Sequence, residues 1–129
     1  MTSRLPAQDS SSAEPIDKWE IQLRKGCLEL AILASLWGGR LYGLEILRRL
    51  EENANLTLSA STVYPLLARL KADGLVESEW VDEDLVHPRK YYRLTAAGRR
   101  RGVEMAQVWS RFAASLGALM SPLLKEGRS

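Results

Sequence analysis

The stretch STVYPLLARLKADGLVESEW, residues 61–80, contains a helical pattern, a glycine stop and a strand-like run. Its apolar side chains recur at the i, i+3, i+4, i+7 spacing of one helix face, at Val63, Leu66, Leu67 and Leu70. The opposite face carries small or weakly polar residues, where Glu and Lys would normally improve helicity. These residues are Ser61, Pro65, Ala68 and Ala72. The outer face is therefore neither a charged solvent face nor an apolar one.

Polar side chains flank this small-residue face on both sides. A helix that enters the major groove of DNA needs small residues where its backbone approaches the base edges. Side chains near its N-terminus can then reach bases or phosphates, and cations can reach the sugar–phosphate backbone. This pattern favours DNA contact over an ordinary surface helix. The residues predicted to contact DNA from this helix are Ser61, Thr62, Tyr64, Pro65, Arg69 and Lys71.

Length and composition limit the classes of protein that the chain can form. Its 129 residues are enough for one domain with a modest core, and 26% charged residues are ordinary for a globular protein. The net charge of +2 is too small to indicate an anionic partner by itself. Cys27 cannot form an internal disulfide, and His87 is the one other soft ligand. We therefore expect no metal site and no cofactor.

The N-terminal segment, residues 1–17, is rich in Ser, Pro and acids and lacks apolar periodicity, which predicts a disordered arm. It has no apolar run typical of a signal peptide, and no segment approaches membrane-spanning length. From these features we expect a cytoplasmic protein without a membrane partner.

The remaining chain predicts three helices, a hairpin and a long last helix. The third helix begins at Ser59 or Ser61, since either could cap it, although a start at Ser59 would place Pro65 beyond the first turn and imply distortion. This order is typical of a mainly α (α+β) winged helix-turn-helix with a two-stranded wing over residues 18–95, followed by a C-terminal helix over residues 96–124. The predicted elements are helices at about 18–36, 42–53, 59–74 and 96–120, and strands at 76–81 and 89–94, with Thr95 as the last cap and an end or kink at Ser121–Pro122.

The last helix carries an apolar stripe at alternating spacings of 4 and 3, the a/d pattern of a coiled coil. The three shorter helices and the hairpin already supply a core, so a second stripe of this length needs a partner. A large exposed apolar patch would be a liability on a monomer. Dimerisation is therefore favoured over packing within one chain. The predicted interface residues are Met105, Trp109, Phe112, Leu116 and Leu119, with Leu123 continuing the stripe.

Four segments in order resemble the PadR family of bacterial transcriptional regulators, and the resemblance covers about residues 23–119. They are LELAILASLW (28–37), LYGLEILRRLEE (41–52), LSASTVYPLLARLKADGLVESEW (58–80) and PRKYYRLTAAGRR (88–100). The single C-terminal helix is similar to the short class of the family. The resemblance implies a homodimer, joined through that helix and the first one, that binds a palindromic operator. It further implies a repressor that a small molecule can release.

The resemblance also assigns roles outside the third helix. It places Arg89 or Lys90 of the hairpin on the DNA backbone, with His87 beside them, whereas the alternative is that these residues neutralise acids across the turn. It implies that Trp109 lines a site for a small planar aromatic effector, although packing is the commoner role for a seam tryptophan. One segment departs from the family: the turn DEDLVHP (82–88) carries three acids and no glycine. Those acids would repel phosphate, which argues against insertion of the tip into the minor groove.

The predicted function is thus DNA-binding transcriptional regulation without enzymatic activity. The alternative is a winged-helix module for protein–protein association, in which the basic residues only interact with solvent. An enzyme is disfavoured because the sequence has no paired carboxylates, no nucleophile–base set and no phosphate-binding glycine loop.

Overall fold

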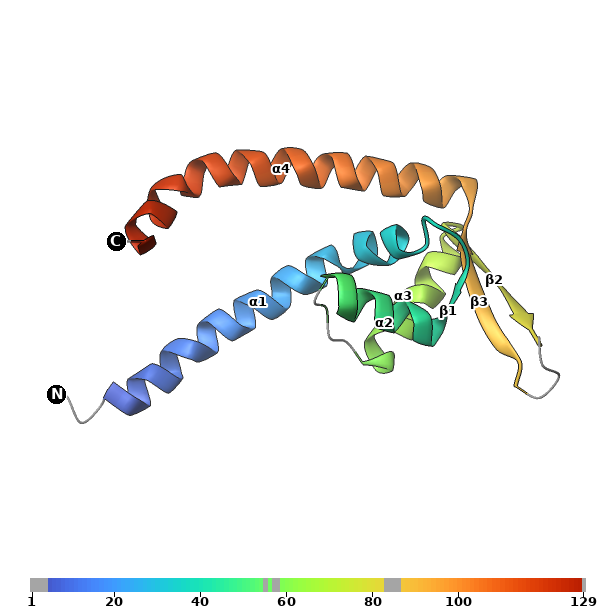
Figure 1. Ribbon diagram of the computed structural model, residues 1–129, viewed down its shortest axis with the longest axis horizontal. Coiled ribbons are helices and arrows are strands. Elements are labelled where there is room, and N and C mark those ends of the chain that lie inside the picture. The colour runs from blue at the N-terminus through green and yellow to red at the C-terminus, as the bar shows by residue number, and fades with distance from the viewer. Residues whose placement is uncertain (1–4, 55, 57–58, 83–86, 129) are drawn as a thin grey trace.

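The computed structural model describes residues 5–54, 56, 59–82 and 87–128. Three helices precede a hairpin and a long last helix, which confirms the predicted winged-helix class (Figure 1). Among these residues, no helix is long and apolar enough to cross a bilayer. The elements are α1 (Leu5–Ser35), β1 (Leu41–Tyr42), α2 (Gly43–Ala54), α3 (Ala60–Ala72), β2 (Val76–Val81), β3 (Arg89–Leu94) and α4 (Ala96–Arg128).

The sheet is antiparallel, with strand order β1-β3-β2. The bounds predicted for the two hairpin strands agree with those of β2 and β3. The sequence did not predict β1, because two residues are too few to show an alternating pattern. Tyr42 of β1 pairs with Tyr91 of β3, so this short strand fixes the start of α2 against the wing.

The core lies where α1, α2, α3 and the base of the sheet meet. The face of α3 predicted to be apolar supplies three fully buried residues, and Leu66 packs at its edge. Burial of each large aliphatic side chain contributes about 1.5–3 kcal/mol, so these residues hold α3 firmly and leave its opposite face outward. The largest fully buried side chains are those of Ile32, Leu33, Leu36, Ile46, Val63, Leu67, Leu70 and Val76.

The start of α3 decides between the two predicted caps. Ser59 is the N-cap residue, with an extended backbone (φ −85°, ψ 159°), and its carbonyl accepts from the N–H of Thr62 at 3.0 Å. A start at Ser61 is therefore wrong. Pro65 consequently lies beyond the first turn, where it has no N–H to donate to the carbonyl of Ser61. The Ser59 hydroxyl bonds that of Ser61 at 2.7 Å instead of capping a backbone N–H.

The predicted disordered arm is wrong for residues 5–17, because α1 begins at Leu5 rather than near Lys18. The segment contains no glycine, and adding residues to an existing helix costs far less than starting one. Pro15 removes one backbone hydrogen bond without ending the helix. Residues 1–4 of that arm lie outside the described part of the chain, as do residues 83–86 of the predicted turn.

The last helix passes through Pro122 and ends at Arg128, rather than stopping near Met120. It bends towards its C-terminal end (red in Figure 1), in agreement with the predicted alternative of a kink. Thr95 caps α4 as predicted, because its Oγ1 accepts from the N–H of Gly98 at 3.0 Å.

The same threonine joins the end of α3 to the start of α4. Its hydroxyl donates to the carbonyl of Gly74 at 2.6 Å, and its N–H donates to the carbonyl of Leu75 at 3.1 Å. Gly74 has a φ of +76°, which favours glycine and ends α3 as the sequence predicted. A Cβ on Gly98 would lie 1.9 Å from the carbonyl oxygen of Leu75. Only glycine fits at position 98 without moving backbone.

Replacing Gly98 with alanine is expected to lower the free energy of unfolding by about 3 kcal/mol or more, because the clash is with backbone rather than with a flexible side chain. Gly117→Ala is the matched control in the same helix, since nothing lies within 4 Å of its added Cβ. It should be neutral or stabilising by up to about 1 kcal/mol. Urea unfolding followed by circular dichroism measures both changes, and equal stability of the two variants would contradict the junction described above.

Candidate nucleic-acid interface

The outer face of α3 is exposed along its whole length. Ser61, Pro65, Ala68 and Ala72 all face solvent, while the opposite face is buried. The helix lies beside α2 and the hairpin, on the side of the molecule away from α4 (Figure 1). Nothing in the described chain therefore covers the small-residue face, and its backbone is accessible to a large partner.

Tyr64, on one flank of that face, packs against the first residue of α2. A Cβ on Gly43 would lie 2.3 Å from Cε1 and 2.4 Å from the hydroxyl of Tyr64, so the ring lies directly over the glycine. The ring remains 40% exposed. The sequence predicted Tyr64 as a contact residue but not the role of Gly43. The one sequence signal for that role is a glycine directly after an aromatic residue at the start of a helix. Glycine at position 43 thus sets where the phenol of Tyr64 lies.

The two cations of α3 lie on opposite flanks and have different surroundings. Arg69 turns towards α1 and forms an ion pair with Glu29, at 3.5 Å between Nη2 and Oε1. Lys71 lies on the Tyr64 flank and is exposed, without an ion pair to any described residue. An exposed ion pair contributes about 0–1 kcal/mol, so Arg69 can exchange its partner for a phosphate.

The cations of the wing lie over aromatic rings. The guanidinium of Arg89 is 4.6 Å from the ring centroid of Tyr42. The ammonium of Lys90 is 5.9 Å from the ring centroids of both Trp80 and Tyr92. Neither cation pairs with a described carboxylate, although acids 83 and 84 of the turn lie outside the described residues. Contact with the rings does not neutralise the two cations, so among the described residues their positive charge is available to a phosphate.

Ion pairs do neutralise other cations of the sheet. Arg93 donates to Glu77 at 2.7 Å, which raises the pKa of its guanidinium further, and Arg40 donates to Glu79 at 3.1 Å. Arg40 also lies 4.5 Å from the ring centroid of Tyr91. Cross-strand neutralisation therefore occurs on the outer face of the sheet, at residues other than the predicted Arg89 and Lys90. His87 is exposed and lies two residues before β3.

A crevice of about 380 Å³ lies between the N-terminus of α2, α3 and the wing. Burial, and secondarily the nearby Tyr64, raise the pKa of Tyr92, so the Tyr92 phenol stays protonated at neutral pH and can donate a hydrogen bond. Among the described residues, the lining contains two cations and three tyrosines but no carboxylate. The residues of this wing crevice are Tyr42, Gly43, Leu44, Tyr64, Trp80, Arg89, Lys90 and Tyr92.

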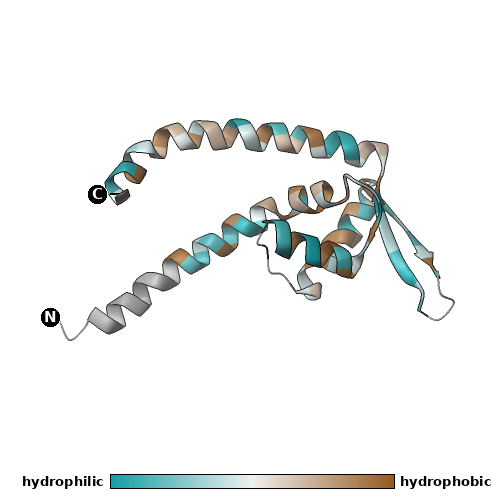
Figure 2. Ribbon diagram, in the orientation of Figure 1, coloured by the Kyte–Doolittle hydropathy of each residue, from teal (hydrophilic) through white to brown (hydrophobic). Residues whose placement is uncertain are grey.

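The apolar stripe of α4 is exposed in the single chain. Phe112 is 63% and Leu119 77% exposed, and Trp109 and Leu116 are also exposed, whereas Met105 packs against the core. Figure 2 shows hydrophobic residues recurring along α4 among hydrophilic ones. α1 adds its own exposed apolar residues, which the sequence analysis did not assign to an interface: Ile16, Trp19, Ile21 and Leu23.

Two open apolar pockets between α1 and α4 are lined by Trp109. One, of about 600 Å³, also includes Trp19 and Leu23, and the other, of about 320 Å³, includes Phe112. Cys27 lines both. Among the described residues, no group of three or more His, Cys, Asp or Glu side chains could hold a metal ion.

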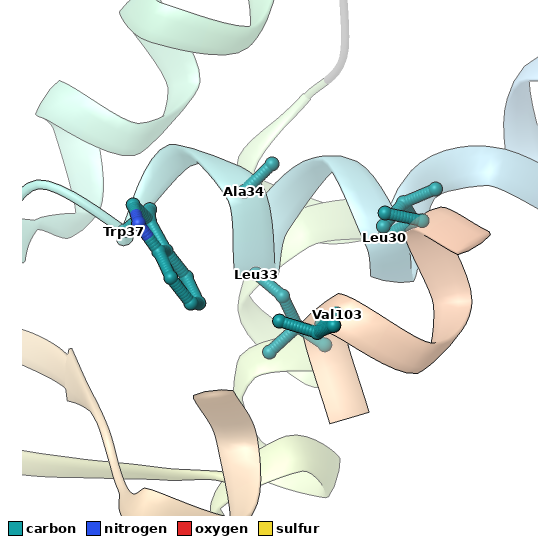
Figure 3. Close-up of a pocket in the computed structure, with 7 residues that line it drawn as sticks. Leu30, Leu33, Ala34, Trp37 and Val103 are labelled. Carbon is teal, nitrogen blue, oxygen red and sulfur yellow. The ribbon is translucent and has the colours of Figure 1, made fainter. Parts of the chain in front are cut away.

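A third apolar pocket, of about 240 Å³, lies nearer the start of α4 and does not include Trp109 (Figure 3). Trp37 forms one wall, and Arg99 lies over its ring at 4.8 Å from the centroid. The lining residues are Leu30, Leu33, Ala34, Trp37, Gly102, Val103 and Ala106.

Comparison with known proteins places this geometry in a family. A PadR-like transcription factor from Bacteroides fragilis is 36% identical, with a TM-score of 0.65, over 79% of this chain and 98% of that one. A PadR family regulator from Eggerthella lenta is 31% identical, with a TM-score of 0.78, over 86% of this chain and 96% of that one. An uncharacterized protein of Lysinibacillus sphaericus is 27% identical over 88 residues, which cover 67% of this chain and 81% of that protein.

The family model described as the transcriptional regulator PadR-like family matches residues 32–104, from the end of α1 through the start of α4. This range includes the exposed face of α3, the wing cations and the Thr95 junction. The chain belongs to the PadR-like family of DNA-binding transcriptional regulators.

Proposed function

We propose that this regulator is a homodimeric repressor that places α3 in the major groove of a palindromic operator. The observation that carries the proposal is the exposed small-residue face of α3, beside wing cations that pair with no described carboxylate. Small residues let the helix backbone approach base edges closely, and the flanking cations favour phosphate. The proposed DNA-contacting residues are Ser61, Thr62, Tyr64, Pro65, Arg69, Lys71, His87, Arg89 and Lys90.

The homodimer is supported by the exposed stripe of α4 together with the apolar residues of α1. An apolar surface of this length on one chain favours a partner that buries it. A second copy offers the same stripe, and a two-fold axis would present two α3 helices to DNA. Because half-sites mirror the protein's symmetry, the operator is then palindromic. Repression follows if the bound dimer excludes the transcription machinery from its promoter.

Release by a small molecule is supported by the pockets lined by Trp109. They lie between α1 and α4, the helices proposed to form the dimer, so a ligand there could change how the two subunits meet. Their walls are apolar and aromatic, which suits a planar aromatic effector. The alternative function, a module for protein–protein association, would use the same exposed apolar residues without any DNA contact.

Ala68→Glu tests whether the outer face of α3 enters the groove. The substitution adds bulk and a negative charge facing the DNA, so operator binding should be lost, while Glu is a good helix former and the fold should remain. Fluorescence anisotropy with labelled fragments of the protein's own upstream DNA measures binding, and circular dichroism checks the fold.

Lys25→Glu is the matched control for Ala68→Glu. It changes the charge twice as much, on an exposed residue of α1. It should retain specific binding. Wild-type affinity in Ala68→Glu would contradict the placement of α3, and absence of wild-type binding at every salt concentration would favour the protein–protein alternative.

Replacing Phe112 and Leu116 together with Glu tests the dimer. The exposed side chains contribute little to the fold of one chain, but two buried unpaired charges in the seam are strongly unfavourable. Sedimentation equilibrium should show a monomer, and anisotropy titrations should show weakened operator binding. Persistence of a folded dimer of wild-type affinity would remove α4 from the interface.

Trp109→Leu tests the effector site. Planar aromatic compounds that bind beside Trp109 should quench tryptophan fluorescence of the wild type and quench this variant much less. Trp37→Leu is the control from the third pocket, and it should retain the quenching. Equal quenching in wild type and Trp109→Leu would show that the compounds bind elsewhere.

A further inference from the structure

Trp80 is the largest apolar side chain on the wing, and the core does not use it. Trp80 lies on the same face of β2 as Val76 and Ser78, and this alternation predicts a buried side chain. Trp80 is nevertheless 68% exposed. The reason is that the hairpin extends beyond the helices at this point (Figure 1). Trp80, Leu44 and Tyr64 are all exposed and line the same crevice, so the exposed apolar surface there is contiguous rather than a single scattered residue.

Trp80 and Lys90 face the same crevice. They are directly paired residues of β2 and β3, so their side chains leave the same face of the sheet. Tyr92 lies on that face as well, two residues along β3, and the Lys90 ammonium is equally far from both rings. The ammonium is therefore held near the indole, and the two present an apolar surface next to a positive charge.

The crevice has the chemistry of a site for an anion with an apolar flank. The charged residues in the described part of its lining, Arg89 and Lys90, are both positive, and the phenols of Tyr64 and Tyr92 can donate hydrogen bonds to phosphate oxygens. Trp80 and Leu44 add exposed apolar walls. A sugar–phosphate segment combines an anionic phosphate with the weakly polar face of a deoxyribose, and so matches both parts.

The position of the crevice favours DNA as the source of that phosphate. Tyr64 belongs both to the flank of the α3 outer face and to the crevice lining, so the two surfaces are continuous. A DNA strand beside α3 must pass this point. The carboxylate of Asp82, exposed directly after β2, disfavours phosphate contact further out along the hairpin, which moves the backbone contact towards the base of the wing.

We infer that the wing crevice binds one sugar–phosphate segment of the operator backbone, with Trp80 packed on a deoxyribose and Lys90 neutralising the phosphate. The inference rests on the proposed function, and it adds Trp80 to the DNA interface and assigns the wing a backbone contact through its inner strand face. Such a contact positions the protein without reading bases, so it contributes to operator and unrelated DNA alike.

Two substitutions separate the apolar and the charged parts of this contact. Trp80→Ala should weaken binding to operator and unrelated duplex by the same factor, roughly tenfold for about 50 Å² of lost apolar contact, with an unchanged salt dependence. Lys90→Gln should weaken binding to both duplexes and reduce the slope of log affinity against log salt by about 0.9, because one phosphate is no longer neutralised. Trp80→Phe should recover most of the affinity.

Arg93→Gln is the matched control, since Arg93 lies on the same strand but on the opposite face, paired with Glu77. It removes the same charge and should leave the salt slope unchanged. Anisotropy titrations of the full chain over a salt series give all of these values, and melting temperatures check each fold. Wild-type affinity in Trp80→Ala, or equal slopes in Lys90→Gln and Arg93→Gln, would overturn the inference.

The outcomes also separate this inference from the proposed function. If the wild type binds the operator and Ala68→Glu does not, the placement of α3 in the groove stands, whatever the result for Trp80→Ala. Inorganic phosphate at ionic strength matched with chloride should not displace the duplex. Displacement by phosphate in wild type but not in Lys90→Gln would overturn the inference in favour of a site for free phosphate.

Discussion

The arrangement of α3 relative to α4 depends on the hydroxyl of Thr95. It donates to the last turn of α3 at Gly74 and accepts from the first turn of α4 at Gly98, so one side chain joins both helix ends. The Leu75 carbonyl approaches so closely that residue 98 can carry no Cβ. A displacement of α4, which carries the proposed dimer contacts, must therefore move the end of α3 or break this junction. The proposed DNA contact of α3 and the proposed dimer contact of α4 would be coupled through it if two arrangements of α4 were populated.

The pockets along α1 and α4 are lined by the helix, α4, that this junction joins to α3. The pocket at Trp37 and Val103 lies within two turns of Gly98, whereas the pockets at Trp109 lie further along α4. The proposed effector, bound at either place, would shift α3 through this junction if it favoured one position of α4 over another. The required differential affinity is modest, since about 1.4 kcal/mol changes an equilibrium tenfold.

The wing divides its charges between two faces, and this division sets what it can bind. On the outer face, Arg93 and Arg40 are paired with glutamates, whereas Arg89, which leaves the same face of β3 as Arg93, lies over the Tyr42 ring and lines the crevice. On the inner face, Lys90 lies near the rings of Trp80 and Tyr92, and no described carboxylate pairs with it. Arg89 and Lys90 nevertheless both line the crevice beside Tyr64 of α3, so their positive charge is concentrated there. A weakly charged chain can attract a phosphate backbone in this way, because local potential rather than net charge acts over a Debye length.

The sequence by itself determined the element order, the hairpin strands, the Thr95 cap, the buried face of α3 and the family, because each of these depends on local periodicity, capping chemistry or short motifs. Tertiary structure decided the rest. Periodicity could not place β1, which is two residues long, nor predict that α1 extends back to Leu5. It also could not separate Arg69, which turns to Glu29, from Lys90, which lies between Trp80 and Tyr92. The partners of a long charged side chain come from segments distant in sequence, so only the folded chain brings the wing, α2 and α3 together into one crevice.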